Sequence, residues 1–169
     1  MKKRFLFIFS SLCLCIILTC SIPVSAAVFL SPFGDIVDDG GHLDWYADTN
    51  YYWEVRWAMN LWNAYRPGVI REDSFSTIND VSIFDINSST AGYYGCTDKS
   101  TNTIYFNIYS MNKLNSYEKK SVAAHEFGHA LGLDHNSLNE NAVMTDIEEF
   151  PTVLDIDDKD SYDAAALLY

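Results

Sequence analysis

Residues 125–135 of the chain read HEFGHALGLDH, with histidine at the first, fifth and eleventh positions and glutamate at the second. Residues four apart lie on one face of an α-helix, so His125 and His129 can direct their ring nitrogens at one metal ion. Their axial offset is about 6 Å, which two imidazole rings can close onto a zinc ion with bonds of about 2.0–2.1 Å. The spacing predicts a metal-binding helix.

A third ligand in tetrahedral geometry cannot come from the same straight helix. Gly132 can end the helix, because glycine enters the left-handed conformation at little cost, and the chain then turns back and presents His135. Three neutral imidazoles leave the fourth position of zinc open for water, which is typical of a catalytic site. Glu126 is the expected general base, which takes a proton from the zinc-activated water and later gives it to the leaving amine. The alternative, histidines that merely pack in a core, is disfavoured by the ligand spacing and the terminating glycine.

The segment His125 to His135 resembles the extended zinc-binding motif of the metzincin peptidases, and its residue sequence is similar to that of the matrixins, the matrix metalloproteinase family. Ala142-Val143-Met144-Thr145 resembles the Met-turn of that family, which implies that Met144 lies beneath the zinc ion. The resemblance implies a zinc metalloendopeptidase in a small secreted bacterial form, with one catalytic zinc ion and a peptide or protein substrate.

The same resemblance implies an α+β fold with a twisted mixed β-sheet, a long packing helix, a zinc-binding helix, a Met-turn and a C-terminal helix. A cleft near Gly132 would separate an upper from a small lower subdomain. Sequence patterns predict strands at residues 42–46, 81–86 and 103–108, and a loop at 87–102. They predict helices at about 51–65, from about 116 to 131, and from 155 to 169.

Two of these elements carry more specific expectations. Trp53, Trp57 and Leu61 recur every four residues and are predicted to form the buried face of the first helix. The strand at 103–108 is expected to pair with an extended peptide.

The N-terminus has the pattern of a secretory signal. Three basic residues at positions 2–4 precede an apolar run from 5 to 20, and Val24-Ser25-Ala26 supplies the small residues of a cleavage site. Residues 1–26 are therefore predicted to be a signal peptide and residues 27–169 a single catalytic domain. The alternatives are a membrane anchor, for which the run is short, and a lipid anchor at Cys20.

The net charge of the chain indicates which classes of partner it would repel. Removal of the three basic residues at positions 2–4 lowers the formal net charge from −12 to −15. Such a surface repels nucleic acid and anionic membranes, so we expect neither a nucleic-acid partner nor stable membrane association. The expected product is a secreted, extracellular monomer.

The sequence leaves the roles of several residues undecided. Cys96 is the single cysteine beyond the signal, and it is either a latch on the zinc ion or a semi-buried loop thiol, of which the thiol is favoured. Calcium could be bound by the aspartates of residues 155–160, for which helix capping is the better account, or by carbonyls of residues 91–101. His42 is the one further histidine, so the structural zinc site of matrixins has no evident counterpart. Asn136 stands where matrixins usually carry serine.

The function itself has alternatives. A catalytically inactive zinc-binding or adhesion module on the same scaffold is the second class, and the retained Glu126 argues against it. A zinc hydrolase of non-peptide amides is the third.

Residues 146–154 would, by the resemblance, line the pocket for the side chain that follows the scissile bond. Four apolar residues there predict cleavage before large apolar residues. Two glutamates could instead admit Lys or Arg. The apolar residues are Phe150, Pro151, Val153 and Leu154, and the glutamates are Glu148 and Glu149.

Overall fold

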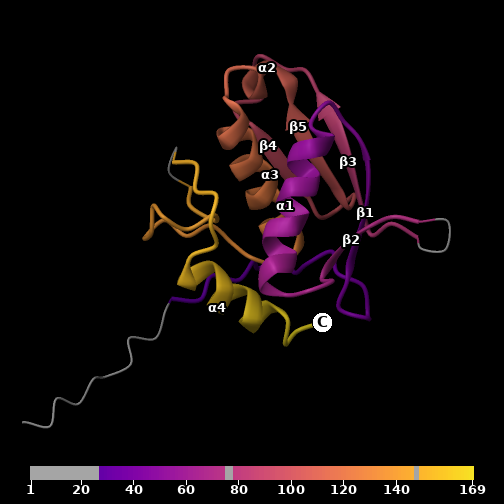
Figure 1. Cartoon of the computed structure of the whole chain (residues 1–169), viewed down its shortest axis with the longest axis vertical. Helices are drawn as coiled ribbons and strands as arrows, with labels where there is room; N and C mark the ends of the chain where they lie inside the picture. The colour runs from indigo at the N-terminus through magenta and orange to yellow at the C-terminus, as the bar shows by residue number, and fades with distance from the viewer. Residues whose placement is uncertain (1–26, 75–77, 147–148) are drawn as a thin grey trace, which may run out of the picture.

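The computed structural model describes residues 27–74, 78–146 and 149–169 (Figure 1). The predicted signal peptide, residues 1–26, lies outside this part of the chain. Within it, no helix is both long enough and apolar enough to cross a membrane. A five-stranded sheet carries two long helices on one face, with a further helix below them, so the expected α+β fold is confirmed (Figure 1).

The sheet is mixed. Its strands are β1 (Leu43–Asp48), β2 (Ile70–Glu72), β3 (Val81–Ile86), β4 (Gly95–Asp98) and β5 (Thr103–Asn107). Their order is β2-β1-β3-β5-β4, and all neighbours are parallel except β4 and β5. In β3 the buried side chains of Val81 and Ile83 alternate with less buried ones, as expected where one face of a sheet is covered. In β1, by contrast, Leu43, Asp44 and Trp45 are all buried.

β5 occupies an interior position of this sheet. It ends at Asn107, and it is hydrogen-bonded to β3 on one side and to β4 on the other. The expectation that this strand pairs with an extended peptide is therefore wrong, because both of its edges are already used. β4 lies within the segment predicted to be a loop and is the terminal strand of the sheet next to β5.

Two helices pack on the sheet and on each other. α1 (Tyr52–Tyr65) and α3 (Ser116–Ala130) lie side by side, and the Trp62 indole Nε1 donates a hydrogen bond of 3.0 Å to the Ala124 carbonyl (Figure 1). α2 (Ile108–Met111) is a single turn that follows β5. α4 (Ile156–Ala165) lies below α1 and ends four residues before the predicted terminus at 169.

The buried face of α1 differs from the prediction. Val55, Ala58 and Trp62 are its buried residues, whereas Trp53 is 73% exposed. Trp57 and Leu61 are only half-buried. Both sets of positions fit a helical period, and contact with α3 and the sheet decides which of them turns inward. The predicted stripe was therefore wrong.

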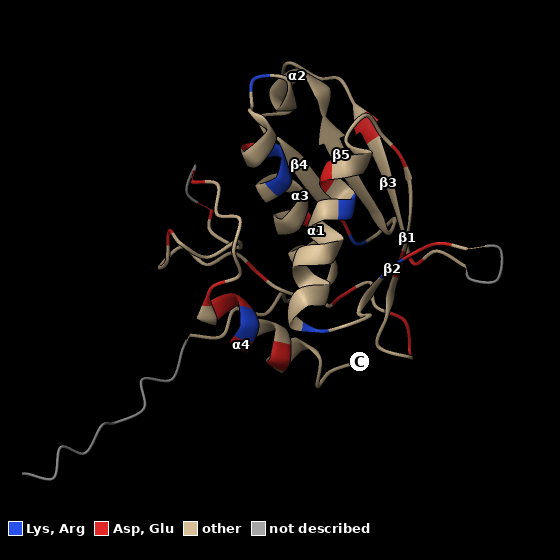
Figure 2. Cartoon of the chain, in the orientation of Figure 1, with Lys and Arg blue, Asp and Glu red and all other residues tan. Residues whose placement is uncertain are grey.

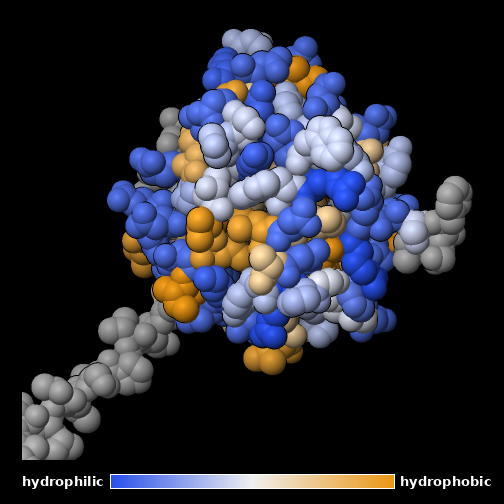
Figure 3. All heavy atoms as spheres, in the orientation of Figure 1, coloured by the Kyte–Doolittle hydropathy of each residue, from blue (hydrophilic) through white to orange (hydrophobic). Residues whose placement is uncertain are grey.

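One hydrophobic cluster joins the sheet, α1, α3, the segment after α3 and α4. Acidic side chains are distributed over the helices and connecting segments, and the few Lys and Arg residues are dispersed among them (Figure 2). Polar residues cover most of the face seen in Figure 3, around an apolar patch near its middle. The continuous cluster ties the helix that carries the histidines to the rest of the molecule.

Candidate active site

Helix α3 carries the first part of the histidine motif at its C-terminal end. Its N-terminus is fixed by a capping box, in which the Asn115 side chain accepts from the backbone N–H of Glu118 and the Glu118 carboxylate accepts from that of Asn115. Its C-terminus is followed by Gly132, which adopts φ +93°, in the left-handed region. The helix stop predicted at this glycine is therefore present, and the chain turns back toward α3.

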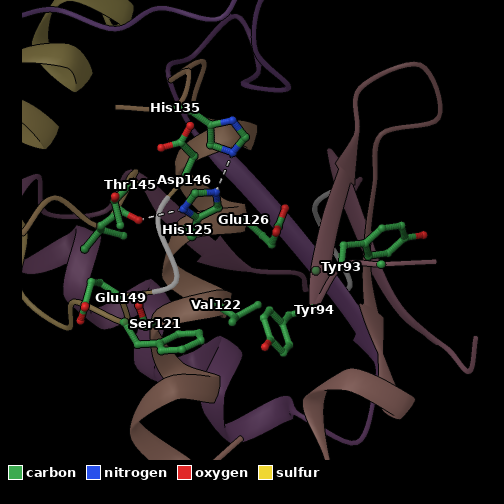
Figure 4. A pocket seen from close by; sticks show the side chains of 14 residues that line it. Tyr93, Tyr94, Ser121, Val122, His125, Glu126, His135, Thr145, Asp146 and Glu149 are labelled. Carbon is green, nitrogen blue, oxygen red and sulfur yellow. Dashed lines mark hydrogen bonds between the residues drawn. The ribbon is translucent and has the colours of Figure 1, made fainter. Parts of the chain in front are cut away.

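The three histidines of the motif come together. His135 Nε2 lies 3.1 Å from His129 Nε2 and 3.2 Å from His125 Nε2. Two ligands of a tetrahedral zinc ion with bonds of about 2.0–2.1 Å are about 3.3–3.4 Å apart. The two separations from His135 are thus close to those that such an ion requires, and the three ligand nitrogens all lie within 4.8 Å of one another. Figure 4 shows His125 and His135 facing one another.

Backbone carbonyls orient two of these rings. His125 Nδ1 lies 2.8 Å from the Val143 carbonyl oxygen, and His129 Nδ1 lies 3.0 Å from that of Leu133. In each ring Nδ1–H is the donor to the carbonyl, so Nε2 keeps its lone pair for a metal ion. Burial lowers the pKa of His125 to about 4 and that of His129 to about 3. Both rings are therefore neutral at pH 7, which is the state that ligates metals.

Glu126 is buried, at 5% exposure, between α3 and β4. The Thr97 hydroxyl lies 2.7 Å from Glu126 Oε2 and 3.0 Å from the Glu126 carbonyl oxygen, and it donates its one proton to this pair of acceptors, with the carboxylate the nearer. Burial raises the pKa of the Glu126 carboxyl to about 7, and the Thr97 hydrogen bonds oppose this rise. A carboxyl group with a pKa near neutrality can accept and return a proton at physiological pH.

Met144 packs against α3, as its resemblance to a Met-turn residue implies. A Cβ built on Gly128 would lie 2.1 Å from Met144 Sδ, and Met144 is 2% exposed. The turn is fixed from below by Asp158 of α4, whose carboxylate accepts from the backbone N–H groups of Val143 and Met144 at 2.8 and 3.1 Å. The Met144 turn and α4 therefore support the same end of α3.

The acidic start of α4 has a structural explanation. Asp155 is the N-cap, and a capping box links it to Asp158. Asn139 Nδ2 donates to both Asp155 and Asp157, at 3.1 and 2.8 Å. The interpretation of these aspartates as capping residues rather than calcium ligands accounts for their contacts.

A further carboxylate group brings together Asp38, Asp44 and Asp80. Arg71 makes a bidentate pair with Asp44, with distances of 2.6 and 2.8 Å, and Asp80 Oδ2 accepts from the Asp44 backbone N–H at 2.7 Å. His42, expected to be a solvated residue at a strand end, lies 3.6 Å from Asp38 and is partly exposed. Arg71 and backbone N–H groups thus already donate to each of the three carboxylates, and the one arginine offsets one of their three negative charges.

Two cavities flank the histidines. One, of about 620 Å³, is lined by Phe33, Lys99 and Asp134 together with the histidines. Cys96 also lines it, as a free, half-buried thiol whose pKa is raised by burial. The other, of about 390 Å³, is lined by Tyr94, Val122 and Phe150 on its apolar side.

The smaller cavity differs from the predicted pocket. Asp146 and Glu149 line it together with Phe150 (Figure 4). Pro151 and Val153 line a separate depression, and Leu154, which also borders that depression, is a buried core residue. Glu148 lies outside the described residues. Of the four apolar residues expected to line the pocket, only Phe150 does so, because the chain beyond it leaves the cavity to begin α4.

Thr97 and Gly95 are site residues that the sequence did not indicate. Both belong to β4, in a segment whose Gly, Ser and Thr content is typical of a loop. Only the antiparallel pairing with β5 places them against Glu126.

Comparison with known proteins gives a family match. A model of the matrixin family matches residues 42–169. No curated protein matches the chain. Among solved structures, the chain is similar to one described as the "GM1 bound form of the ECX AB5 holotoxin", with 16% identity, a TM-score of 0.49, and coverage of 76% of this chain and 80% of that one.

Proposed function

The chain belongs to the matrixin family, and from this premise we propose that it is a zinc-dependent endopeptidase. The observation that carries the proposal is the convergence of three histidine Nε2 atoms, with separations of 3.1 and 3.2 Å, next to a buried glutamate. A family match alone leaves open whether a member has kept its catalytic groups. Glu126, the proposed general base, is present here and lines both cavities beside the histidines, which supports the proposal.

The residues present fit a zinc ion. His125, His129 and His135 would hold it, since they offer three imidazole nitrogen donors within 4.8 Å of one another. Zinc bound there would supply Lewis-acid activation of a water molecule and polarise the substrate carbonyl. One such ion per chain is proposed. The carbonyls of Val143 and Leu133 keep the rings of His125 and His129 in the ligating orientation.

Glu126 performs the proton transfers in this proposal. Its carboxylate takes a proton from the attacking water and then delivers it to the amide nitrogen that leaves. Its burial shields it from competing solvent, and in the zinc-free chain this burial raises its pKa to about 7. The chain thus supplies the base and, after the first transfer, the acid.

The cleft suits an extended peptide. β4 is the terminal strand of the sheet, and cavities lie on both sides of Glu126 along it. A peptide that pairs with β4 would pass the histidines with side chains reaching both cavities. A peptide or protein is therefore the proposed substrate. An inactive zinc-binding module is the weaker alternative, because it gives no reason for a buried glutamate in this place.

The experiment combines metal analysis with turnover of a fluorogenic peptide library. Purified protein should hold one zinc per chain and lose activity on chelation. Glu126→Gln should retain zinc and lose at least about 100-fold in kcat. His135→Ala should instead release zinc on dialysis. Full activity in Glu126→Gln, or zinc retention in His135→Ala equal to wild type, would show that these residues have other roles.

The proposal also covers the division of the chain into a signal segment and a catalytic domain. We infer that residues 1–26 are removed as a secretory signal, leaving residues 27–169 as a single catalytic domain outside the cell. Intact-mass measurement of the protein recovered from culture medium tests this. Retention of residues 1–26 on a cell-associated product would contradict it.

A further inference from the structure

Strand β4 approaches Glu126 with two residues of the same face. Gly95 and Thr97 are two positions apart, and side chains at that spacing point to the same side of a strand. Thr97 donates its hydroxyl to Glu126 Oε2 at 2.7 Å. Among the residues labelled in Figure 4, Glu126 lies between His125 and Tyr93. Tyr93 precedes β4 in the chain by two residues.

Gly95 provides the room for this contact. A Cβ built on Gly95 would lie 2.7 Å from Glu126 Oε1, 2.8 Å from its Cγ and 3.0 Å from its Cδ. Carbon atoms do not approach a carboxylate so closely, so any larger residue would push the Glu126 side chain away from β4. Gly95 and Thr97 therefore determine together where the carboxylate rests.

The contact resists rotation of the side chain. A glutamate has three rotatable side-chain bonds, and one hydrogen bond to a carboxylate oxygen fixes the far end. The same hydroxyl lies 3.0 Å from the Glu126 carbonyl oxygen, so Thr97 spans the backbone and the carboxylate of one residue. A hydroxyl has one proton and two lone pairs, so it can remain in contact whether or not the carboxyl carries a proton.

We propose that Thr97 is a positioning residue for Glu126 and that Gly95 is the glycine that makes this contact sterically feasible. The inference rests on the proposed function, in which Glu126 is the general base. Thr97 does not touch the reacting atoms in this scheme. It holds the carboxylate where it reaches the attacking water, so its loss affects kcat rather than substrate binding.

The test begins with Thr97→Val, which keeps the branched shape and removes the hydroxyl. Loss of a hydrogen bond to a charged group corresponds to at least about a tenfold decrease in rate. We expect kcat to fall by that factor with KM changed less than about twofold and with one zinc per chain retained. Thr97→Ser, which restores the hydroxyl, should recover kcat to within about threefold of wild type.

A matched control is Thr103→Val in β5. Thr103 is a buried threonine whose hydroxyl donates to the Thr101 carbonyl at 3.0 Å and makes no contact with Glu126. This variant should leave kcat unchanged. If Thr97→Val fails to fold, Gly95→Ala decides, because its methyl group displaces the same carboxylate without removing the Thr97 hydroxyl and should also lower kcat.

A double variant separates this inference from the proposed function. In a Glu126→Gln background, Thr97→Val should change the residual kcat less than about twofold, because the residue it positions is already disabled. Wild-type kcat in both Thr97→Val and Gly95→Ala would overturn the positioning role and leave the zinc peptidase intact. An equal loss in both backgrounds would assign Thr97 a purely structural role. Full activity in Glu126→Gln alone would instead refute the proposed function.

Discussion

Gly128 of α3 leaves room for the side chain of Met144, in the turn that follows the helix. A Cβ on Gly128 would lie 2.1 Å from Met144 Sδ, 3.2 Å from Met144 Cε and 3.3 Å from Trp62 Cζ2. Met144 is 2% exposed and Trp62 is fully buried, so the sulfur has no open space into which it can move. We therefore predict that Gly128→Ala destabilises the fold.

Two effects of opposite sign set the size of this change. Overpacking of a core costs about 1–3 kcal/mol, and an overlap this large belongs at the upper end of that range. Alanine is more stable than glycine in a helix interior by about 1 kcal/mol. The net loss is about 2 kcal/mol, which lowers the melting temperature by about 4–8 °C in a domain of this size.

The assay is thermal unfolding followed by circular dichroism, with all variants at the same excess of zinc. Met144→Ala provides the matched background, because it removes the sulfur that the new methyl group would meet. In that background Gly128→Ala should be neutral or stabilising by about 1 kcal/mol. If Gly128→Ala alone melts at or above the wild-type temperature, Met144 does not pack on α3 as described.

The Gly128→Ala substitution should also weaken zinc binding at the histidines. The carbonyl of Val143, next to Met144, is the 2.8 Å partner of His125 Nδ1. A displaced turn withdraws this partner, and changes of that kind typically cost 10- to 100-fold in metal affinity, so we expect about tenfold. Competition with a chromogenic chelator measures it. Unaltered zinc affinity together with the predicted fall in melting temperature would show that the turn supports the fold without orienting His125.

Two further predictions concern ionisation and specificity. In the zinc-free protein, burial raises the pKa of Glu126 to about 7, above the value of about 4.3 expected in the unfolded chain. The folded state therefore keeps a proton that the unfolded state releases, and this stabilising contribution is lost as the pH rises from about 4.3 to 7. The free energy of unfolding of Glu126→Gln should therefore rise relative to that of wild type by up to about 3 kcal/mol between pH 5 and pH 8, as measured by urea titration. A difference between the two proteins that does not change with pH would contradict the burial of this carboxylate. Mass-spectrometric mapping of cuts in a peptide library should show large apolar residues and Lys or Arg after the scissile bond, because Phe150 offers an apolar wall and Asp146 and Glu149 line the same cavity. Enrichment of Asp or Glu at that position would exclude this cavity as the pocket concerned.

The sequence predicted those parts of the structure that depend on local spacing. Two histidines four residues apart share a helix face in any α-helix, and glycine after the last turn permits a left-handed stop in any context. For this reason the helix that carries His125 and His129, its end at Gly132 and the return of His135 all appear where the motif placed them. The capping box at Asp155 is likewise a local pattern.

Burial of α1 depends instead on what packs against it. Trp53 has a larger apolar surface than Ala58, yet it faces solvent. The guanidinium carbon of Arg56 lies 6.0 Å from the Trp53 ring. Ala58 is buried, because a small residue allows α3 to approach closely, and Trp62 is buried because its indole N–H finds the Ala124 carbonyl. Size and hydrophobicity alone could not identify this face, since the partner helix lies more than fifty residues away in the chain.

The wall of the candidate site shows the same limit more sharply. Thr97 and Gly95 contact Glu126 across 29 and 31 positions of sequence. Their strand is short and has no large apolar residue, because one edge lacks a neighbouring strand and one face meets a carboxylate. Those requirements remove the alternation of apolar and polar residues by which strands are recognised. A local motif can therefore bring the metal ligands together, but the position of the base depends on a distant strand. Substitutions in β4 should accordingly alter turnover while leaving the histidine geometry, and hence zinc content, unchanged.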